Sequence, residues 1–217
     1  MIVRNLVYAA ALAISAPGAA QAAAKAGPSF DCAAARKDEV SRAICADPAT
    51  AALDRRIAER FDTLRRDLPE DAATALADDQ HYFEELRNLA FRASGGNAAA
   101  LQATLADRAA FLDAVVPGGP QQRAGTWRNF TGALTVTDDG SVMIVEAQPA
   151  LGASICRITG KLEGAAMAGK VSLHAEPGRS VALARLGTVM VVTDSAAAAE
   201  KPCALGGEPF FRVAAPR

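Results

Sequence analysis

The sequence predicts an α+β protein in which an N-terminal, disulfide-pinned helical bundle precedes a small antiparallel β-barrel or sandwich. Apolar residues recur at helical spacing from Cys32 to Val115. After the Pro-Gly-Gly-Pro segment at 117–120, the apolar period changes to two, which is typical of half-buried strands. The four cysteines divide evenly between the two halves: Cys32, Cys45, Cys156 and Cys203.

Residues 1–22 have the pattern of a secretory signal peptide. Arg4 is the only charge before Lys25, Leu6–Ser15 is apolar, and Ala20-Gln21-Ala22 has the small-x-small form of a cleavage site. The apolar run is too short to span a bilayer, which takes ~20 residues. We therefore expect a protein of the periplasm or the extracellular space, with no stable membrane anchor after cleavage.

Cysteines in an exported chain predict disulfide bonds. Three pairings are open, and proximity in the sequence favours Cys32–Cys45 and Cys156–Cys203. Zinc would require closely spaced Cys-x-x-Cys pairs, which the sequence lacks, so we expect neither a metal nor a cofactor. A bridge across a loop of this size stabilises a domain by ~3 kcal/mol in the chain-entropy model.

Capping and breaking residues place the helices of the first half. A short helix is expected between the first two cysteines, and their disulfide is expected to pin it to the start of the longer helix that follows. Asp47 can cap a longer helix, Pro48 suits its first turn, and Leu68-Pro69 ends it. Two further helices are expected on either side of a Gly-Gly break, over about residues 70–92 and 98–115.

A hairpin signal dominates the second half. Asp138-Asp139-Gly140 separates the alternating runs 133–137 and 142–145, and Trp127 opens the strand before them. The expected division is a helical domain over 30–116 and an all-β domain over 124–217. Further strands are expected at 154–158, 170–174, 181–186, 189–193 and 210–213.

The charge balance gives no indication of a nucleic-acid partner. The formal net charge is −1, whereas nucleic-acid binding calls for a strongly basic surface. The charge is uneven: residues 23–115 carry 12 Lys and Arg against 16 Asp and Glu, and residues 116–217 carry 10 against 8. An acidic part of net charge −4 joined to a part of net charge +2 indicates two different surfaces.

A motif surrounds the first two cysteines. It consists of an aromatic residue, Asp and Cys, then a helix ending in Ala-Ile-Cys, then Asp-Pro and Leu-Asp. The motif resembles the N-terminal domain of the LprI-like lysozyme inhibitors, which are exported bacterial proteins. Two departures are Ser41, where that family usually has Glu, and Ala90, where it often has a further cysteine. The matching residues are Phe30, Asp31, Cys32, Ala43, Ile44, Cys45, Asp47, Pro48, Leu53 and Asp54.

The resemblance implies a protein of the cell envelope that binds and inhibits a lysozyme and is not itself an enzyme. Its partner would be lysozyme or another cell-wall-associated protein. Most c-type lysozymes are basic, so the acidic helical part would attract them electrostatically. The alternative is a non-inhibitory periplasmic binding module for cell-wall sugars or a partner protein. In that case the β-part would carry the binding site.

Three residues are candidates for binding, and each has a structural alternative. Asp31 and Asp54 could meet a partner, or they could cap helices and accept backbone hydrogen bonds. Trp127, the only tryptophan, could bind a sugar or a protein, or it could fill the core of the β-part. His81 and Glu85 lie one helical turn apart, but a solvated helix face explains them better than a metal site or acid–base chemistry.

A peptidoglycan-active enzyme is a third hypothesis, and two features of the sequence argue against it. No serine lies in a Gly-x-Ser-x-Gly elbow. One Trp and two Tyr supply few aromatic platforms for a sugar-binding cleft.

Overall fold

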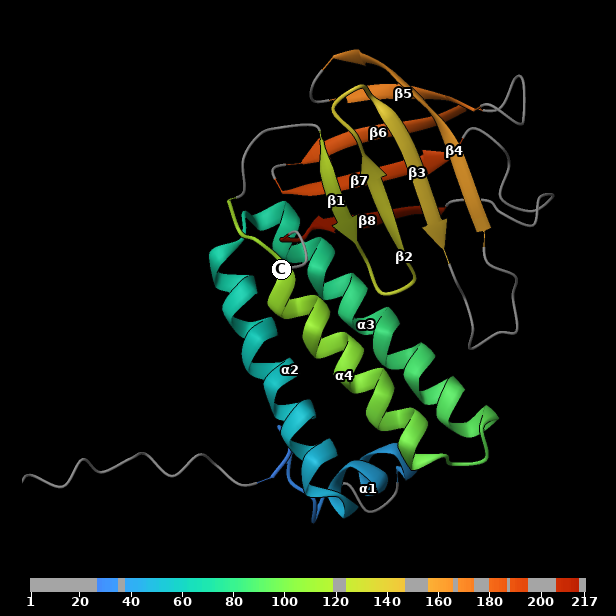
Figure 1. Cartoon of the computed structure of the whole chain (residues 1–217). Coiled ribbons are helices and arrows are strands. Elements are labelled where there is room, and N and C mark those ends of the chain that lie inside the picture. Colours follow the sequence, from blue (N-terminus) through green and yellow to red (C-terminus); the bar gives the residue numbers. More distant parts are fainter. Residues whose placement is uncertain are drawn as a thin grey trace, which may run out of the picture.

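The computed structural model has an α+β architecture, as predicted, with four helices followed by eight strands in the part that it describes (Figure 1). Residues 1–22 and Cys203 lie outside that part, and so does the side chain of Cys156. The signal peptide and the Cys156–Cys203 bridge therefore stay predictions. The described residues are 27–34, 38–118, 124–146, 156–165, 168–173, 180–186, 188–194 and 206–214.

Side-chain caps begin three of the four helices. Asp38, Asp47 and Asn97 each accept a hydrogen bond from the amide three residues later, which satisfies a free N–H of the first turn. Pro48 occupies the first turn of its helix, as predicted. The helices are α1 (Glu39–Ala46), α2 (Pro48–Asp67), α3 (Glu70–Ala93) and α4 (Ala98–Ala114).

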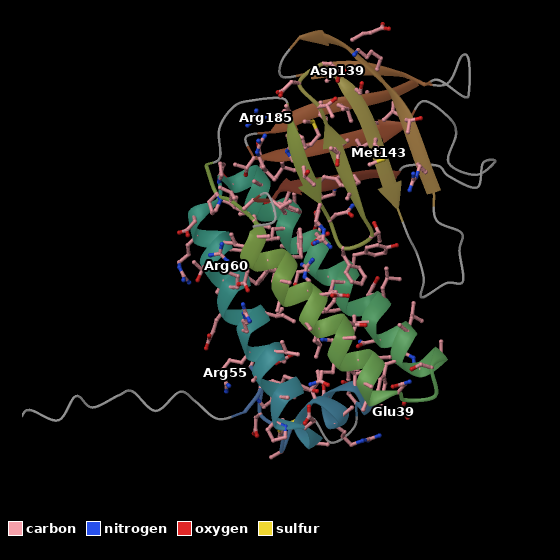
Figure 2. The ribbon with its side chains drawn as sticks, viewed as in Figure 1. Glu39, Arg55, Arg60, Asp139, Met143 and Arg185 are labelled. Atoms are coloured by element: carbon pink, nitrogen blue, oxygen red, sulfur yellow. A yellow bond between two sulfur atoms is a disulfide. The ribbon has the colours of Figure 1, made fainter. Side chains whose placement is uncertain are left out.

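Helices α2, α3 and α4 run side by side, and α1 lies across the end farthest from the strands (Figure 1). Leu64, Leu76, Phe83 and Leu105 are completely buried in the core between them. Arg60 on α2 donates to the carbonyl oxygens of Leu112 and Val115 at 3.1 Å each (Figure 2), so a cation satisfies carbonyls at the C-terminal end of α4. None of the helices that the structure describes is long and apolar enough to cross a bilayer.

The strands form a closed antiparallel barrel in which each strand pairs with the next along the chain and β1 also pairs with β8. A barrel, not a sandwich, is thus the form that the β-part takes. The strand predicted at 154–158 runs on to residue 165 because its alternation continues through Leu162. The strands are β1 (Gly125–Arg128), β2 (Gly132–Val136), β3 (Ser141–Glu146), β4 (Cys156–Ala165), β5 (Ala168–Leu173), β6 (Ser180–Leu186), β7 (Val189–Asp194) and β8 (Gly206–Arg212).

The barrel packs against the helices, and the two share one hydrophobic core. Val189 and Phe211 of the barrel, and Val213 just after β8, belong to the same buried core as the helices. The chain after α4 also joins the sheet, since Val116 N donates to Arg212 O at 3.1 Å and Val115 bridges Val213. The core therefore continues across the predicted division between residues 116 and 124.

A buried ion pair adds to this junction. Arg108 on α4 donates to Asp79 on α3 at 2.5 Å, and the two side chains are 0% and 5% exposed. The second carboxylate oxygen of Asp79 accepts from the amide of Phe130, in the β1–β2 loop, at 3.2 Å. The Phe130 ring meets Phe83 of α3 edge to face at 4.8 Å. One carboxylate thus links two helices and the barrel.

Candidate binding surface at the disulfide end

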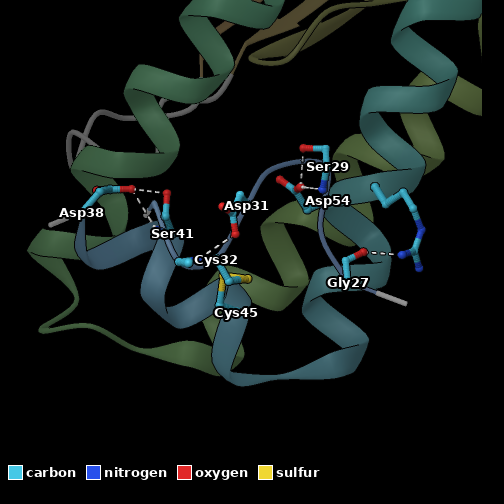
Figure 3. The surroundings of a disulfide bond; sticks show 10 residues. Gly27, Ser29, Asp31, Cys32, Asp38, Ser41, Cys45 and Asp54 are labelled. Atoms are coloured by element: carbon cyan, nitrogen blue, oxygen red, sulfur yellow. Dashed lines mark hydrogen bonds between the residues drawn. A yellow bond between two sulfur atoms is a disulfide. The ribbon is translucent and has the colours of Figure 1, made fainter. Parts of the chain in front are cut away.

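The Cys32–Cys45 disulfide is present, as predicted (Figure 3). It joins the segment before α1 to the last turn of α1 over a sequence separation of 13. The bond therefore holds residues 27–34 against α1, whereas the sequence suggested that it would pin α1 to the longer helix. The junction with α2 is made instead by Asp47, which directly follows α1 and caps α2.

Asp54 fixes the N-terminal segment to α2. The residue is 8% exposed, and its carboxylate accepts from Ser29 N at 2.8 Å and from Ser29 Oγ at 2.6 Å (Figure 3). Arg55, the next residue, donates to the carbonyl oxygen of Gly27. Phe30 packs against the helical core. The buried carboxylate is thus occupied by hydrogen bonds within the chain, which is the structural role that the sequence left open for it.

Asp31 remains at the surface. Its Oδ1 accepts from Ala33 N at 2.9 Å, and its backbone carbonyl accepts from Ala34 N at 3.1 Å, so it closes a turn next to Cys32. The side chain is exposed, unlike that of Asp54. Asp31 is therefore the one candidate that a partner could contact directly at this end of the molecule.

Trp127 is a core residue of the barrel and does not belong to this surface. It is 0% exposed and packs with Leu134, Ile144 and Phe210 inside the barrel. Strand β1, which carries it, lies at the opposite end of the molecule from α1 (Figure 1). The structure thus brings Asp31 and Asp54 together but not Trp127, and burial removes this indole from direct contact with a sugar or a protein.

His81 and Glu85 form an exposed pair on α3. Their side chains are 76% and 59% exposed, with 3.3 Å between Nε2 and Oε1. In the described part of the chain, no group of three or more His, Cys, Asp or Glu is arranged to hold a metal ion. The pair has the surroundings of a solvated helix face.

Sequence reasoning missed two features of the region around the Cys32–Cys45 disulfide. Ser29 was not recognised as the partner of Asp54, because nothing local links residues 25 positions apart. Asp38 was not recognised as the cap of α1, although Asp is among the residues preferred at the start of a helix. The Ser41 hydroxyl and amide hydrogen-bond to Asp38, and the hydroxyl above all lowers the pKa of this carboxyl. Ser41, a departure from the family motif, therefore has a structural role here.

Comparison of the chain with protein-family models, with curated proteins and with solved structures finds no match. The link to the LprI-like inhibitors therefore depends on the residues of the motif alone.

The outer face of the barrel carries a shallow groove of ≈ 270 Å³ over β2, β3 and β4. Met143, which is 39% exposed, lies in it (Figure 2). Its hydroxyl-bearing lining residues are Thr135, Thr137, Ser141 and Thr159.

Proposed function

We propose that this is an exported envelope protein that binds and inhibits a lysozyme through its disulfide end, defined as residues 27–34, α1 and the first turns of α2. The observation that carries the proposal is the way in which residues 27–34 are held. The Cys32–Cys45 bond fixes one side of this segment and the buried Asp54 carboxylate fixes the other. The segment carries the exposed Asp31.

A segment held in this way is well suited to blocking a cleft. Association costs free energy when loops and side chains become ordered, and a preorganised segment loses less conformational entropy. The exposed, acidic side chain of Asp31 is of the kind that would meet the catalytic groove of a basic enzyme. The net charge of −4 over residues 23–115 would raise the association rate, an effect that salt weakens.

The test is a turbidity assay of lysozyme acting on bacterial cell walls, with the purified mature protein added in excess at low salt. We expect slower lysis, with weaker inhibition by Asp31→Asn and by a Cys32→Ser/Cys45→Ser variant. Asp138→Asn is the matched control, because it removes an exposed carboxylate from the β2–β3 turn of the barrel, at the other end of the molecule from α1 (Figure 1). Unchanged lysis rates with excess protein would contradict the proposal for the lysozyme tested.

The groove on the barrel supports a second candidate function, a non-inhibitory module that binds cell-wall sugars or a partner protein. Its hydroxyl groups and the exposed Met143 could contact a ligand on β2–β4. The full chain is needed for this test, because an isolated barrel would expose Phe211 and Val189, which the helices cover. Loss of binding to envelope material in Thr159→Lys but not in Asp31→Asn would favour this second function.

A further inference from the structure

Two arginines, Arg185 and Arg212, point into the same end of the barrel. We call this end the barrel mouth, and it also includes Gly125 and Thr188. Side chains on a strand alternate between its two faces. Leu183 and Phe210 belong to the barrel interior, so Arg185 and Arg212, each two residues farther along its strand, face the same way. The Arg212 amide donates to the carbonyl oxygen of Thr188 at 3.0 Å, which brings the β6–β7 turn beside the end of β8.

Arg212 is held in the mouth by contacts with Trp127 and with the residue before β1. Its guanidinium lies over the Trp127 ring at 4.9 Å, and its Nη2 donates to the carbonyl oxygen of Ala124 at 2.9 Å. Gly125 leaves room for it, since a Cβ at this position, where φ is +150°, would lie 2.6 Å from Nη2. The guanidinium therefore has a fixed place at the start of β1.

Arg185 is 6% exposed and adds a second positive charge at this end (Figure 2). Burial lowers the pKa of Arg185, and the charge of Arg212 lowers it further. A guanidinium nevertheless stays protonated in proteins. An anion bound at this end would interact favourably with both positive charges.

Thr188 supplies an independent observation. Its side chain is 3% exposed, and its Oγ1 has no hydrogen-bond partner among the residues that the structure describes. Buried hydroxyl groups are nearly always hydrogen-bonded. Thr188 stands directly before β7, and its carbonyl oxygen accepts from the Arg212 amide, so its buried hydroxyl lies close to the end of β8.

We propose that the barrel mouth binds a small oxyanion, a phosphate or carboxylate group, between Arg185 and Arg212, with the Thr188 hydroxyl donating a further hydrogen bond. Arginine matches both groups because its planar fork can donate two parallel hydrogen bonds to them. This site is separate from the disulfide end and does not depend on lysozyme binding.

Trp127 provides a direct readout, because it is the only tryptophan of the chain and it lies under the Arg212 guanidinium. The full-length mature protein is titrated separately with inorganic phosphate and with succinate, while its fluorescence is followed. Sodium chloride keeps the ionic strength constant. We expect a saturable change in emission with at least one of the two anions. Saturation by phosphate alone identifies a phosphate site, and saturation by succinate alone identifies a carboxylate site.

Three variants test the assignment of residues. Arg185→Gln should weaken binding roughly tenfold or more and Thr188→Val about threefold, since hydrogen bonds to a charged ligand are among the stronger ones. Arg157→Gln, at an exposed position on β4, should bind like the unmodified protein. Circular dichroism checks folding, and the nearly isosteric Thr188→Val keeps the test valid if Arg185→Gln is unstable. The proposal is overturned if neither anion gives saturation, or if Arg185→Gln and Thr188→Val both bind as tightly as Arg157→Gln.

Discussion

Replacing Asp79 with Ala should destabilise the whole molecule. The substitution removes the carboxylate that accepts from Arg108 and from the Phe130 amide, and it leaves a guanidinium whose side chain is 0% exposed. Gln80 would be its remaining hydrogen-bond partner among those shown, through Nε at 3.1 Å and Nη2 at 2.8 Å. An uncompensated buried charge is one of the few changes that produce a large effect from a single substitution.

The magnitude follows from the burial of the pair. Breaking a buried ion pair by removing one partner costs about 3–5 kcal/mol, against a total stability of about 5–15 kcal/mol for a typical domain. Asp113→Ala is the matched control, because Asp113 also pairs with an arginine across two helices, Arg56. In that pair the side chains are 33% and 62% exposed. Its loss should cost at most about 1 kcal/mol.

Urea unfolding followed by two signals measures the loss of stability and shows whether it affects the helices and the barrel together. Far-UV circular dichroism reports mainly on the helices, and Trp127 fluorescence reports on the barrel core. Because Asp79 binds both α4 and the β1–β2 loop, both midpoints should fall together. If Asp79→Ala costs no more than Asp113→Ala, the buried pair does not have the energetic role that its geometry indicates. A fall in only one signal would show that the two parts unfold independently.

Three further predictions concern other parts of the fold. A Cys32→Ser/Cys45→Ser variant should lose ~3 kcal/mol of unfolding free energy. Reduction of the disulfide in the unmodified protein should cost the same amount, and a smaller cost would argue against the loop-entropy explanation. Phe211→Ala, at the junction of barrel and helices, should cost about 3–5 kcal/mol in urea unfolding, and a cost below ~1 kcal/mol would contradict the shared core. The pKa of Asp38 is lower in the folded state, so its stabilising effect is present above the unfolded pKa of about 3.9 and is lost as the pH falls through the folded value. The melting temperature of Asp38→Asn should therefore fall less on acidification below about pH 4 than that of the unmodified protein, and equal slopes would refute this.

Local chemistry was readable from the sequence. Asp47 and Pro48 begin α2 as predicted, because a capping side chain and a proline in the first turn act on their own neighbours. The Asp-Asp-Gly turn predicted the β2–β3 hairpin for the same reason, with Gly140 at a φ of +81°. The disulfide between Cys32 and Cys45 followed from their short separation in a chain expected to be exported.

The candidate site was only partly readable. The motif identified Asp31 and Asp54 but could not say that one is exposed and the other buried against Ser29. For Trp127 the sequence left both a core role and a ligand-binding role open, because side-chain chemistry does not reveal which face of a strand is covered. Only its 0% exposure decides the matter.

The sequence by itself determined the order of helices and strands, the start of α2 at Asp47 and Pro48, and the first disulfide, since these depend on neighbours along the chain. The tertiary structure decided that Phe211 of the barrel belongs to the same buried core as the helices, that Asp79 meets the amide of Phe130, 51 residues away, and that Arg185 shares the barrel mouth with Arg212. Those contacts depend on strand register and on how the barrel packs against the helices, and both are set by the burial of many side chains at once.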